Sequence, residues 1–252
     1  MAEALLRVEN VSKRFGGLLA VDHASLTAET GRITALIGPN GAGKTTLFAI
    51  ISGFLPPTEG RIVYDGGDVT REPTHRLARR GIARTFQIVQ PFAGLSVREN
   101  IAVGAHLLRP SRSAALAAAE DVGRTVGLGE LLDRPAATLT VAGRKRLELA
   151  RAIAIEPRLL LLDEVLAGLN PSEIRDMLPI IRAISERGIT IVMIEHVMQA
   201  VMSLAEQVFV LSEGKIIAQG SPQAIANDPR VVEAYLGHGA ASRMKAEGAT
   251  HA

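Results

Sequence analysis

Residues 38–46 of the sequence are GPNGAGKTT, and the organisation of the whole chain can be followed outward from them. They match the pattern G-x-x-x-x-G-K-[ST], whose four defined residues are here Gly38, Gly43, Lys44 and Thr45. The apolar run ITALI at 33–37 predicts a buried strand, and TTLFAII at 45–51 predicts a helix that Gly53 ends. A strand, a glycine loop and a helix in this order indicate a phosphate-binding loop.

The residue types in this loop suit a nucleoside triphosphate. Glycine lets the backbone approach phosphates and turn successive N–H groups toward them, and the N-terminus of the following helix favours negative charge. Lys44 is expected to reach the outer phosphates, and the Thr45 hydroxyl is expected to bind Mg²⁺. The alternative, a glycine turn that merely precedes a lysine, is disfavoured by the flanking strand and helix. The predicted nucleotide contacts are Gly38, Pro39, Asn40, Gly41, Ala42, Gly43, Lys44, Thr45 and Thr46.

Composition limits the class of protein. The chain has 252 residues, of which 47% are hydrophobic, enough for one large α/β domain with a smaller inserted lobe. Its net charge of +2, aromatic content of 3% and lack of tryptophan argue against a nucleic-acid partner. The absence of cysteine excludes disulfides and favours a reducing compartment. The first ten residues do not resemble a secretory signal.

Membrane insertion is also not expected. The most apolar runs, at 159–162 and 189–194, have the length of strands and fall far short of the ~20 residues that cross a bilayer. A role at a membrane would therefore be that of a peripheral partner.

The segments around the loop indicate two kinds of sheet. Strand-like patterns at 5–10 and 18–27, separated by a turn at 11–17, and a hairpin-like piece at 60–67 predict a small antiparallel sheet. Phe15, in the glycine-containing turn, is a candidate to stack on a base, although a lone phenylalanine more often packs in a core.

The middle of the chain has a helical character. Residues 96–106 and 111–120 predict helices, and strand patterns disappear between about 91 and 135. We therefore predict a single domain over 5–236, followed by a disordered tail at 237–252. The predicted parts of the domain are a core of residues 5–90 and 144–236 and a helical subdomain of about 91–143.

Strands and helices then alternate. A helix at 144–155 precedes the strand RLLLL at 158–162, and a helix at 172–187, started by Asn170 and Pro171, precedes the strand at 189–194. This order predicts a parallel, doubly wound sheet of the P-loop (RecA-like) α/β type, with the antiparallel sheet as a subdomain and the helical part as an insertion.

Acidic residues end the first of these strands. Asp163 and Glu164 follow the four leucines, and chemistry in such sheets gathers where the strands end. Asp163 suits a metal ligand for Mg²⁺, which leaves Glu164 to orient or deprotonate the attacking water. The alternative is a pair of acids that cap a strand or helix. His196 ends the next strand and is a weaker candidate to approach the γ-phosphate.

Taken together, these motifs resemble the ATPase subunit of ATP-binding cassette (ABC) transporters over residues 5–237. The matching pieces, in chain order, are Phe15, the loop at 38–46, Gln87 in ARTFQ, the segment at 139–146, the acidic strand at 159–164, AGLN at 167–170 and His196. The resemblance implies an adenine-stacking role for Phe15. It also implies that Gln87 contacts Mg²⁺ and water, so that the predicted catalytic residues are Glu164, His196 and Gln87.

The resemblance further implies a head-to-tail dimer. Each ATP would lie between the phosphate loop of one subunit and the signature segment of a second ATPase subunit, identical or related. Permease subunits in the membrane would be the other partners, which places the chain at the cytoplasmic face of the inner (plasma) membrane. The runs VSKRFGGLLAVD, GIARTFQ and NDPRVVEAYLG look most like the branch that imports branched-chain amino acids. ATPases for lipopolysaccharide export and urea uptake are similar alternatives.

One segment departs from the family pattern. The family signature is Leu-Ser-Gly-Gly-Gln or close to it, whereas residues 139–143 are LTVAG. The predicted contacts with the partner's ATP are Thr140, Ala142 and Gly143. A helix N-terminus can donate backbone N–H groups whatever its side chains are, so the contact can persist with shifted geometry. The departure keeps a second function class open, a nucleotide-binding partner of low turnover. A third class, a soluble cassette acting on ribosomes or DNA, is disfavoured because the chain has no second cassette and no basic patch.

Overall fold

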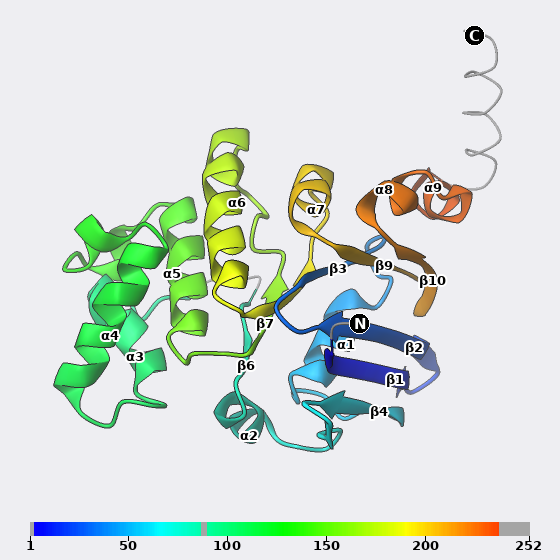
Figure 1. Cartoon of the computed structure of the whole chain (residues 1–252), viewed down its shortest axis with the longest axis horizontal. Helices are drawn as coiled ribbons and strands as arrows, with labels where there is room; N and C mark the ends of the chain where they lie inside the picture. The colour runs from blue at the N-terminus through cyan, green and yellow to red at the C-terminus, as the bar shows by residue number, and fades with distance from the viewer. Residues whose placement is uncertain (1–2, 87–89, 237–252) are drawn as a thin grey trace, which may run out of the picture.

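The computed structural model describes residues 3–86 and 90–236, which form two sheets, a helical layer and a helical lobe (Figure 1). The larger sheet has six strands in the order β10-β9-β3-β8-β7-β6. All of its neighbouring strands are parallel except β10, which is antiparallel to β9. Its strands are β3 (Ile33–Ile37), β6 (Ile82–Arg84), β7 (Leu159–Asp163), β8 (Thr190–Ile194), β9 (Gln207–Ser212) and β10 (Lys215–Gly220).

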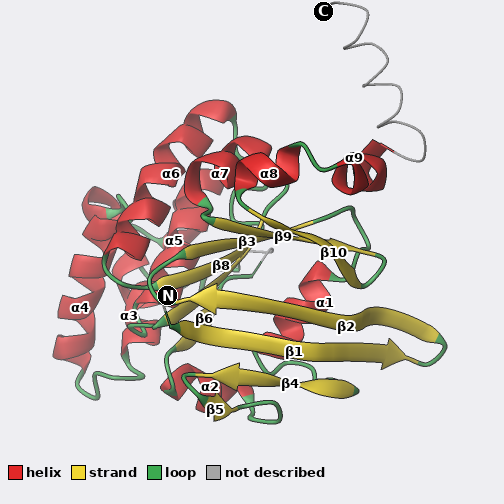
Figure 2. Cartoon of the chain, turned by 45° about the vertical axis from the view of Figure 1, so that its right-hand side comes forward, coloured by secondary structure: helices red, strands yellow, loops and turns green. Residues whose placement is uncertain are grey.

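The smaller sheet is antiparallel, with its strands in the order β2-β1-β4-β5. They are β1 (Ala4–Phe15), β2 (Leu18–Glu29), β4 (Glu59–Tyr64) and β5 (Gly67–Asp68). Figure 2 shows this sheet on the side of the parallel sheet that faces away from α6 and α7. The predicted fold class, a doubly wound core with an antiparallel β subdomain and inserted helices, is confirmed.

Two hydrophobic cores hold these layers together. Every residue of β3, β7 and β8 is buried, as expected for central strands with both faces covered. On one face, helix α1 (Lys44–Ile51) buries Leu47, Phe48, Ile50 and Ile51 between the two sheets. The helix that follows the phosphate loop is therefore anchored on both sides.

The other face of the parallel sheet is covered by helices. Those in and around this layer are α5 (Val141–Ile153), α6 (Pro171–Glu186), α7 (Met198–Leu204), α8 (Pro222–Ala226) and α9 (Pro229–Leu236). The predicted start of α6 is confirmed, since the Asn170 side chain accepts hydrogen bonds from the N–H groups of Ser172 and Glu173. Among the described residues, none of the helices is both long and apolar enough to cross a bilayer.

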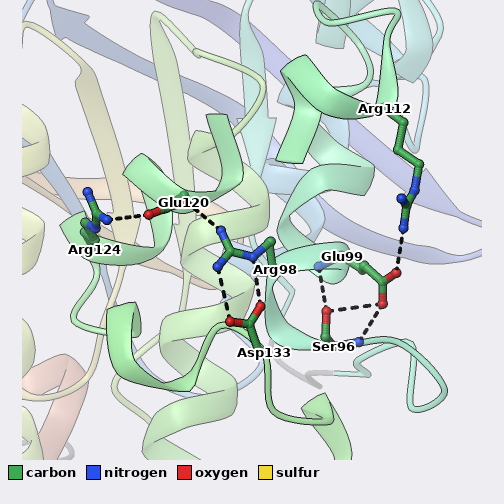
Figure 3. Close-up of polar contacts among 7 residues, drawn as sticks. All are labelled: Ser96, Arg98, Glu99, Arg112, Glu120, Arg124 and Asp133. Carbon is green, nitrogen blue, oxygen red and sulfur yellow. Dashed lines mark hydrogen bonds and ion pairs between the residues drawn. The ribbon is translucent and has the colours of Figure 1, made fainter. Parts of the chain in front are cut away.

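The helical lobe contains α3 (Val97–Ala105) and α4 (Arg112–Thr125), and α5 packs against both. Figure 3 shows the polar network on its surface. The Arg98 guanidinium pairs with Glu120 on α4 at 2.8 Å and with Asp133 at 3.0 Å, so one side chain joins three segments. Ser96 and Glu99 form a reciprocal capping box at the start of α3. These ion pairs and the capping box hold the segments of the lobe together.

Three predicted boundaries need correction. β1 continues through Phe15, because residues 13–15 pair with β2, and only the two glycines after Phe15 form the turn. Helix α4 extends to Thr125. Helix α5 begins at Val141, because the Thr140 hydroxyl caps it by accepting a hydrogen bond from the Gly143 N–H at 3.1 Å. The predicted subdomain boundary at 143 falls in the first turn of this helix and stays a prediction, as does the extent of the domain.

Candidate nucleotide-binding site

The phosphate loop joins the end of β3 to α1 in a conformation that requires glycine. Gly38 has φ +149°, and a Cβ there would lie 1.9 Å from the carbonyl oxygen of Leu211. Gly43 has φ +104°, and its Cβ would lie 2.3 Å from the carbonyl oxygen of Ala20. Because backbone of β9 and of β2 closes on the loop, no side chain fits at either position.

Gly43 is also the N-cap of α1, with no side chain to accept the first N–H groups of the helix. Those groups and the positive end of the helix dipole suit an anion at this point. Lys44 is the first residue of α1 and is 7% exposed. Its ammonium group donates hydrogen bonds to the carbonyls of Gly38 at 2.7 Å and Pro39 at 2.9 Å. Burial lowers the pKa of Lys44, and the nearby charges of Glu164 and Asp163 oppose that shift.

These residues line an open cavity of about 730 Å³, large enough for a nucleotide. The structure brings together most of the predicted contacts. Phe15, 45% exposed, stands at the wall of the cavity beside Leu18 and Ala20, and Glu164 and His196 reach it from the ends of β7 and β8. The loop residues that line it are Asn40, Gly41, Ala42, Gly43, Lys44, Thr45 and Thr46. Gly38 and Pro39 do not line the cavity, but their carbonyls accept the hydrogen bonds from the Lys44 ammonium.

Asp163 and Thr45 lie together at the edge of a second cavity, of about 530 Å³. One carboxylate oxygen of Asp163 accepts a hydrogen bond from Arg84 at 2.8 Å, while the other is buried and has no hydrogen-bond partner among the described residues. A buried carboxylate oxygen without a partner is costly, and Mg²⁺ prefers carboxylate and hydroxyl oxygens. The residues present therefore fit the predicted Mg²⁺ site. The third predicted ligand, Gln87, lies outside the described residues.

Glu164 stands at the corner between β7 and the loop that follows. Its φ is +48°, an uncommon value for a residue with a side chain. Two hydrogen bonds support this backbone: its N–H donates to the carbonyl of Ile194 at 3.0 Å, and its carbonyl accepts from the ammonium of Lys145 at 3.2 Å. A strained backbone conformation persists only where surrounding contacts hold it in place, and such conformations are frequent at active sites.

Two residues outside the predicted set, Lys145 and Glu195, lie next to residues of this site: Lys145 binds the Glu164 carbonyl, and Glu195 directly precedes His196. Lys145 lies on α5 and is 6% exposed, and burial lowers its pKa against the opposing charges of four acids, of which Glu195 acts most strongly. Glu195, 1% exposed, accepts a hydrogen bond from the Leu166 N–H at 3.0 Å. Burial raises the pKa of Glu195 to about 7. The sequence did contain a signal for Glu195, because this acid follows a buried strand and directly precedes His196.

The signature segment lies apart from this cavity. Thr140, Ala142 and Gly143 are at the start of α5, and none of them lines the cavity of the same chain. Their predicted contact is with the ATP of a second subunit, so it stays a prediction.

Comparisons with known proteins agree with this geometry. Residues 21–167 match the family model described as ABC transporter, and residues 215–241 match that described as branched-chain amino acid ATP-binding cassette transporter. The chain is 39% identical to the high-affinity branched-chain amino acid transport ATP-binding protein BraF of Pseudomonas aeruginosa, over 94% of this chain and 99% of BraF. It is also 39% identical to LivG of Escherichia coli, which has the same description, over the same shares of the two chains.

A solved structure supports the fold. The crystal structure of the ADP conformation of MJ1267, an ATP-binding cassette of an ABC transporter, matches with a TM-score of 0.85 and 33% identity, over 94% of this chain and 100% of that one. With the phosphate loop, Glu164 and His196 assembled around one cavity, the chain belongs to the ATP-binding subunits of ABC transporters, in the branch that includes BraF and LivG.

Proposed function

We propose that this chain hydrolyses Mg²⁺-bound ATP as the motor subunit of an importer for branched-chain or related amino acids. The observation that carries the proposal is the convergence of Lys44, Glu164 and His196 on a single cavity of nucleotide size. The choice of solute is supported by the match of residues 215–241 and by the names of the relatives, which are branched-chain amino acid transport proteins.

Each side chain has a role that follows from its place. Lys44 and the N–H groups at the start of α1 bind the phosphates, and Phe15 stacks on the base. Thr45 and Asp163 would hold Mg²⁺, which supplies positive charge for the phosphate oxygens. Glu164 accepts a proton from the attacking water, and His196 donates a hydrogen bond to the γ-phosphate. The hydrogen bonds from and to the Glu164 backbone hold its side chain at the cavity.

The chain is expected to act as a dimer with itself or with a related ATPase. Each ATP would lie between the phosphate loop of one subunit and the start of α5 of the other. In support, the apolar side chain of Val141, at the start of α5, is 56% exposed. ATP would then close the dimer and hydrolysis would reopen it.

The permease partner would dock at a groove between the core and the helical lobe. The groove has a volume of about 250 Å³ and contains the exposed rings of Phe54 and Phe86 at its rim. Phe92, on the segment that joins core to lobe, is 46% exposed and packs its ring under the Arg151 guanidinium at 4.9 Å. Exposed aromatic side chains often become the anchors of an interface. This docking would hold the chain at the cytoplasmic face of the inner membrane.

The proposal is tested first by Lys44→Ala. Removing an ammonium group that binds phosphate costs about 1.5–3 kcal/mol of binding free energy. ATP affinity, measured by calorimetry on the folded protein, should fall by at least about tenfold, and hydrolysis should be lost. Unchanged affinity and hydrolysis in a folded variant would refute the proposed role of the loop.

The transport role is tested by purification of the chain from detergent-solubilised membranes. Permease subunits should co-purify, and a binding protein loaded with leucine should stimulate ATP hydrolysis by the reconstituted complex. Phe92→Ala should weaken the association more than it lowers the melting temperature of the isolated chain. Equal losses would mean that Phe92 serves packing alone, and stimulation only by urea or by a lipid substrate would reassign the solute.

A further inference from the structure

Arg84 forms a buried ion pair that the mechanism above does not use. It ends β6, and its guanidinium donates to Asp163 on the neighbouring strand β7 at 2.8 Å, with side chains only 8% and 3% exposed. A second nitrogen donates to the Ser52 hydroxyl at 3.1 Å, at the C-terminal end of α1. One flat group thus contacts both the proposed metal ligand and the helix that follows the phosphate loop. Removing two charges from water costs free energy, so a buried ion pair contributes little to stability, and a functional role is the better explanation for this one.

The same guanidinium lies over two aromatic rings. Its central carbon is 5.7 Å from the ring centre of Phe54 and 5.5 Å from that of Phe86. The two rings meet edge to face, with their centres 5.6 Å apart. They are 52% and 44% exposed, so one side of this cluster is open to solvent. Guanidinium is suited to such a place because it donates hydrogen bonds along its edges and stacks with its faces.

The arginine therefore stands between two cavities. The groove proposed for the permease is lined by Phe54, Phe86 and Arg84, and the cavity that contains Thr45 and Asp163 is also lined by Phe86 and Arg84. A ligand that displaces the exposed rings would displace the guanidinium plane that contacts both of them. Rotation of that plane changes the hydrogen bond that orients the Asp163 carboxylate.

We propose that Arg84 is a positioning residue that couples the aromatic rim of the groove to the carboxylate of Asp163. Occupation of the groove fixes the two rings, the rings fix the guanidinium, and the guanidinium presents the unpartnered oxygen of Asp163 to Mg²⁺. Coupling between two binding sites is reciprocal, so binding of Mg²⁺ and ATP must alter the surroundings of Phe54. The inference rests on the proposed function in its assignment of Mg²⁺ to Asp163.

The reciprocal effect can be measured without turnover. Because the sequence has no tryptophan, Phe54→Trp introduces a single fluorescent reporter at the rim. The protein is saturated with ATP in EDTA, Mg²⁺ is then added in excess, and the emission change is recorded. In parallel, retention of labelled ATP is measured at graded concentrations of free Mg²⁺. We expect an emission change in the Phe54→Trp protein and its loss when Arg84→Met is added.

Loss of an orienting partner of a metal ligand typically costs 10–100-fold in metal affinity. We therefore expect Arg84→Met to raise the Mg²⁺ midpoint for ATP retention by about that factor. Arg84→Lys keeps a positive charge beside Asp163 but cannot cover both rings, so it should recover most of the midpoint and little of the emission change. It also serves as the test if Arg84→Met does not fold.

The matched control is Arg151→Met, which removes a second arginine that lines both cavities and stacks on an exposed ring, that of Phe92, but that pairs with Glu148 and not with Asp163. This control should keep the emission change and the Mg²⁺ midpoint. The coupling is refuted if the Phe54→Trp protein retains ATP but shows no emission change with Mg²⁺, or if a folded Arg84 variant keeps both the change and the midpoint. Failure of the Phe54→Trp protein to bind ATP at any Mg²⁺ concentration would instead count against the proposed nucleotide site.

Discussion

The phosphate loop and the signature segment both place glycine at the beginning of a helix, and their surroundings differ in an instructive way. At the phosphate loop, backbone from β2 and β9 lies where a Cβ of Gly43 or Gly38 would stand, and no side chain caps α1. At the signature segment, Thr140 caps α5, and a Cβ at Gly143 would meet side-chain atoms of Leu139 at 3.3 Å and the Thr140 hydroxyl oxygen at 3.4 Å. The phosphate loop is shaped by backbone of its own chain, whereas the function of the signature segment is predicted to need a second subunit.

This difference explains how much the sequence could predict. The phosphate loop, the acidic strand end and their order along the chain follow from local patterns. The structure places the loop and Glu164 at one cavity, and Thr45 and Asp163 at a second cavity. The effect of LTVAG at 139–143 is predicted to depend on the ATP of a partner subunit, and no contact among the described residues determines it. The structure adds that Thr140 uses its hydroxyl to cap its own helix.

Contacts between distant segments were also beyond prediction. Arg84 and Asp163 are 79 residues apart and meet only because β6 and β7 are neighbours in the sheet. The hydrogen bond from Lys145 to the Glu164 carbonyl likewise depends on how α5 packs over the end of β7. No periodicity or spacing encodes such pairings, since each residue alone is typical of a helix or a strand.

The largest expected effect comes from Glu164→Gln, which removes the base and leaves both helix starts intact. Hydrolysis should fall by about 10²–10⁴-fold while ATP stays bound. Because bound ATP would still bridge the two loops, a stable dimer should accumulate on size-exclusion chromatography. Normal hydrolysis in both Glu164→Gln and Asp163→Asn would mean that the acidic strand end is structural.

A pair of glycine substitutions compares the two loops directly. Gly38→Ala forces a Cβ against the Leu211 carbonyl at an unfavourable φ, which should lower the free energy of unfolding by about 4 kcal/mol and abolish ATP binding. Gly143→Ala lies in the first turn of a helix and should change stability by no more than about 1 kcal/mol. Urea denaturation of the two variants checks both values, and equal losses would contradict the contrast.

A smaller effect is expected from the buried acid beside the site. The pKa of Glu195 is raised from 4.5 to about 7, so the folded chain holds this proton more tightly than the unfolded chain does. The free energy of unfolding should therefore fall as the pH rises through this range. Glu195→Gln keeps an acceptor for the Leu166 N–H and removes the charge. It should be more stable than the parent by up to about 3 kcal/mol at pH 8, with the difference vanishing near pH 4.

Equilibrium urea denaturation of both proteins at several pH values checks this prediction. Two charged groups act on Glu195: the charge of Glu164 raises its pKa further, and the charge of Lys145 lowers it. A difference between the two proteins that does not change with pH would show that folding does not raise the pKa of Glu195.

The central claim is that the two loops, one from each subunit, enclose the same ATP. Ala142→Asp tests it most directly, because a carboxylate at the start of α5 would face the partner's phosphates in a gap of low dielectric. ATP hydrolysis by the assembled complex should be lost, while the isolated Ala142→Asp chain should bind ATP as the parent does. Full hydrolysis by the assembled variant would contradict the account, and a nucleotide-binding partner of low turnover would then describe this chain better.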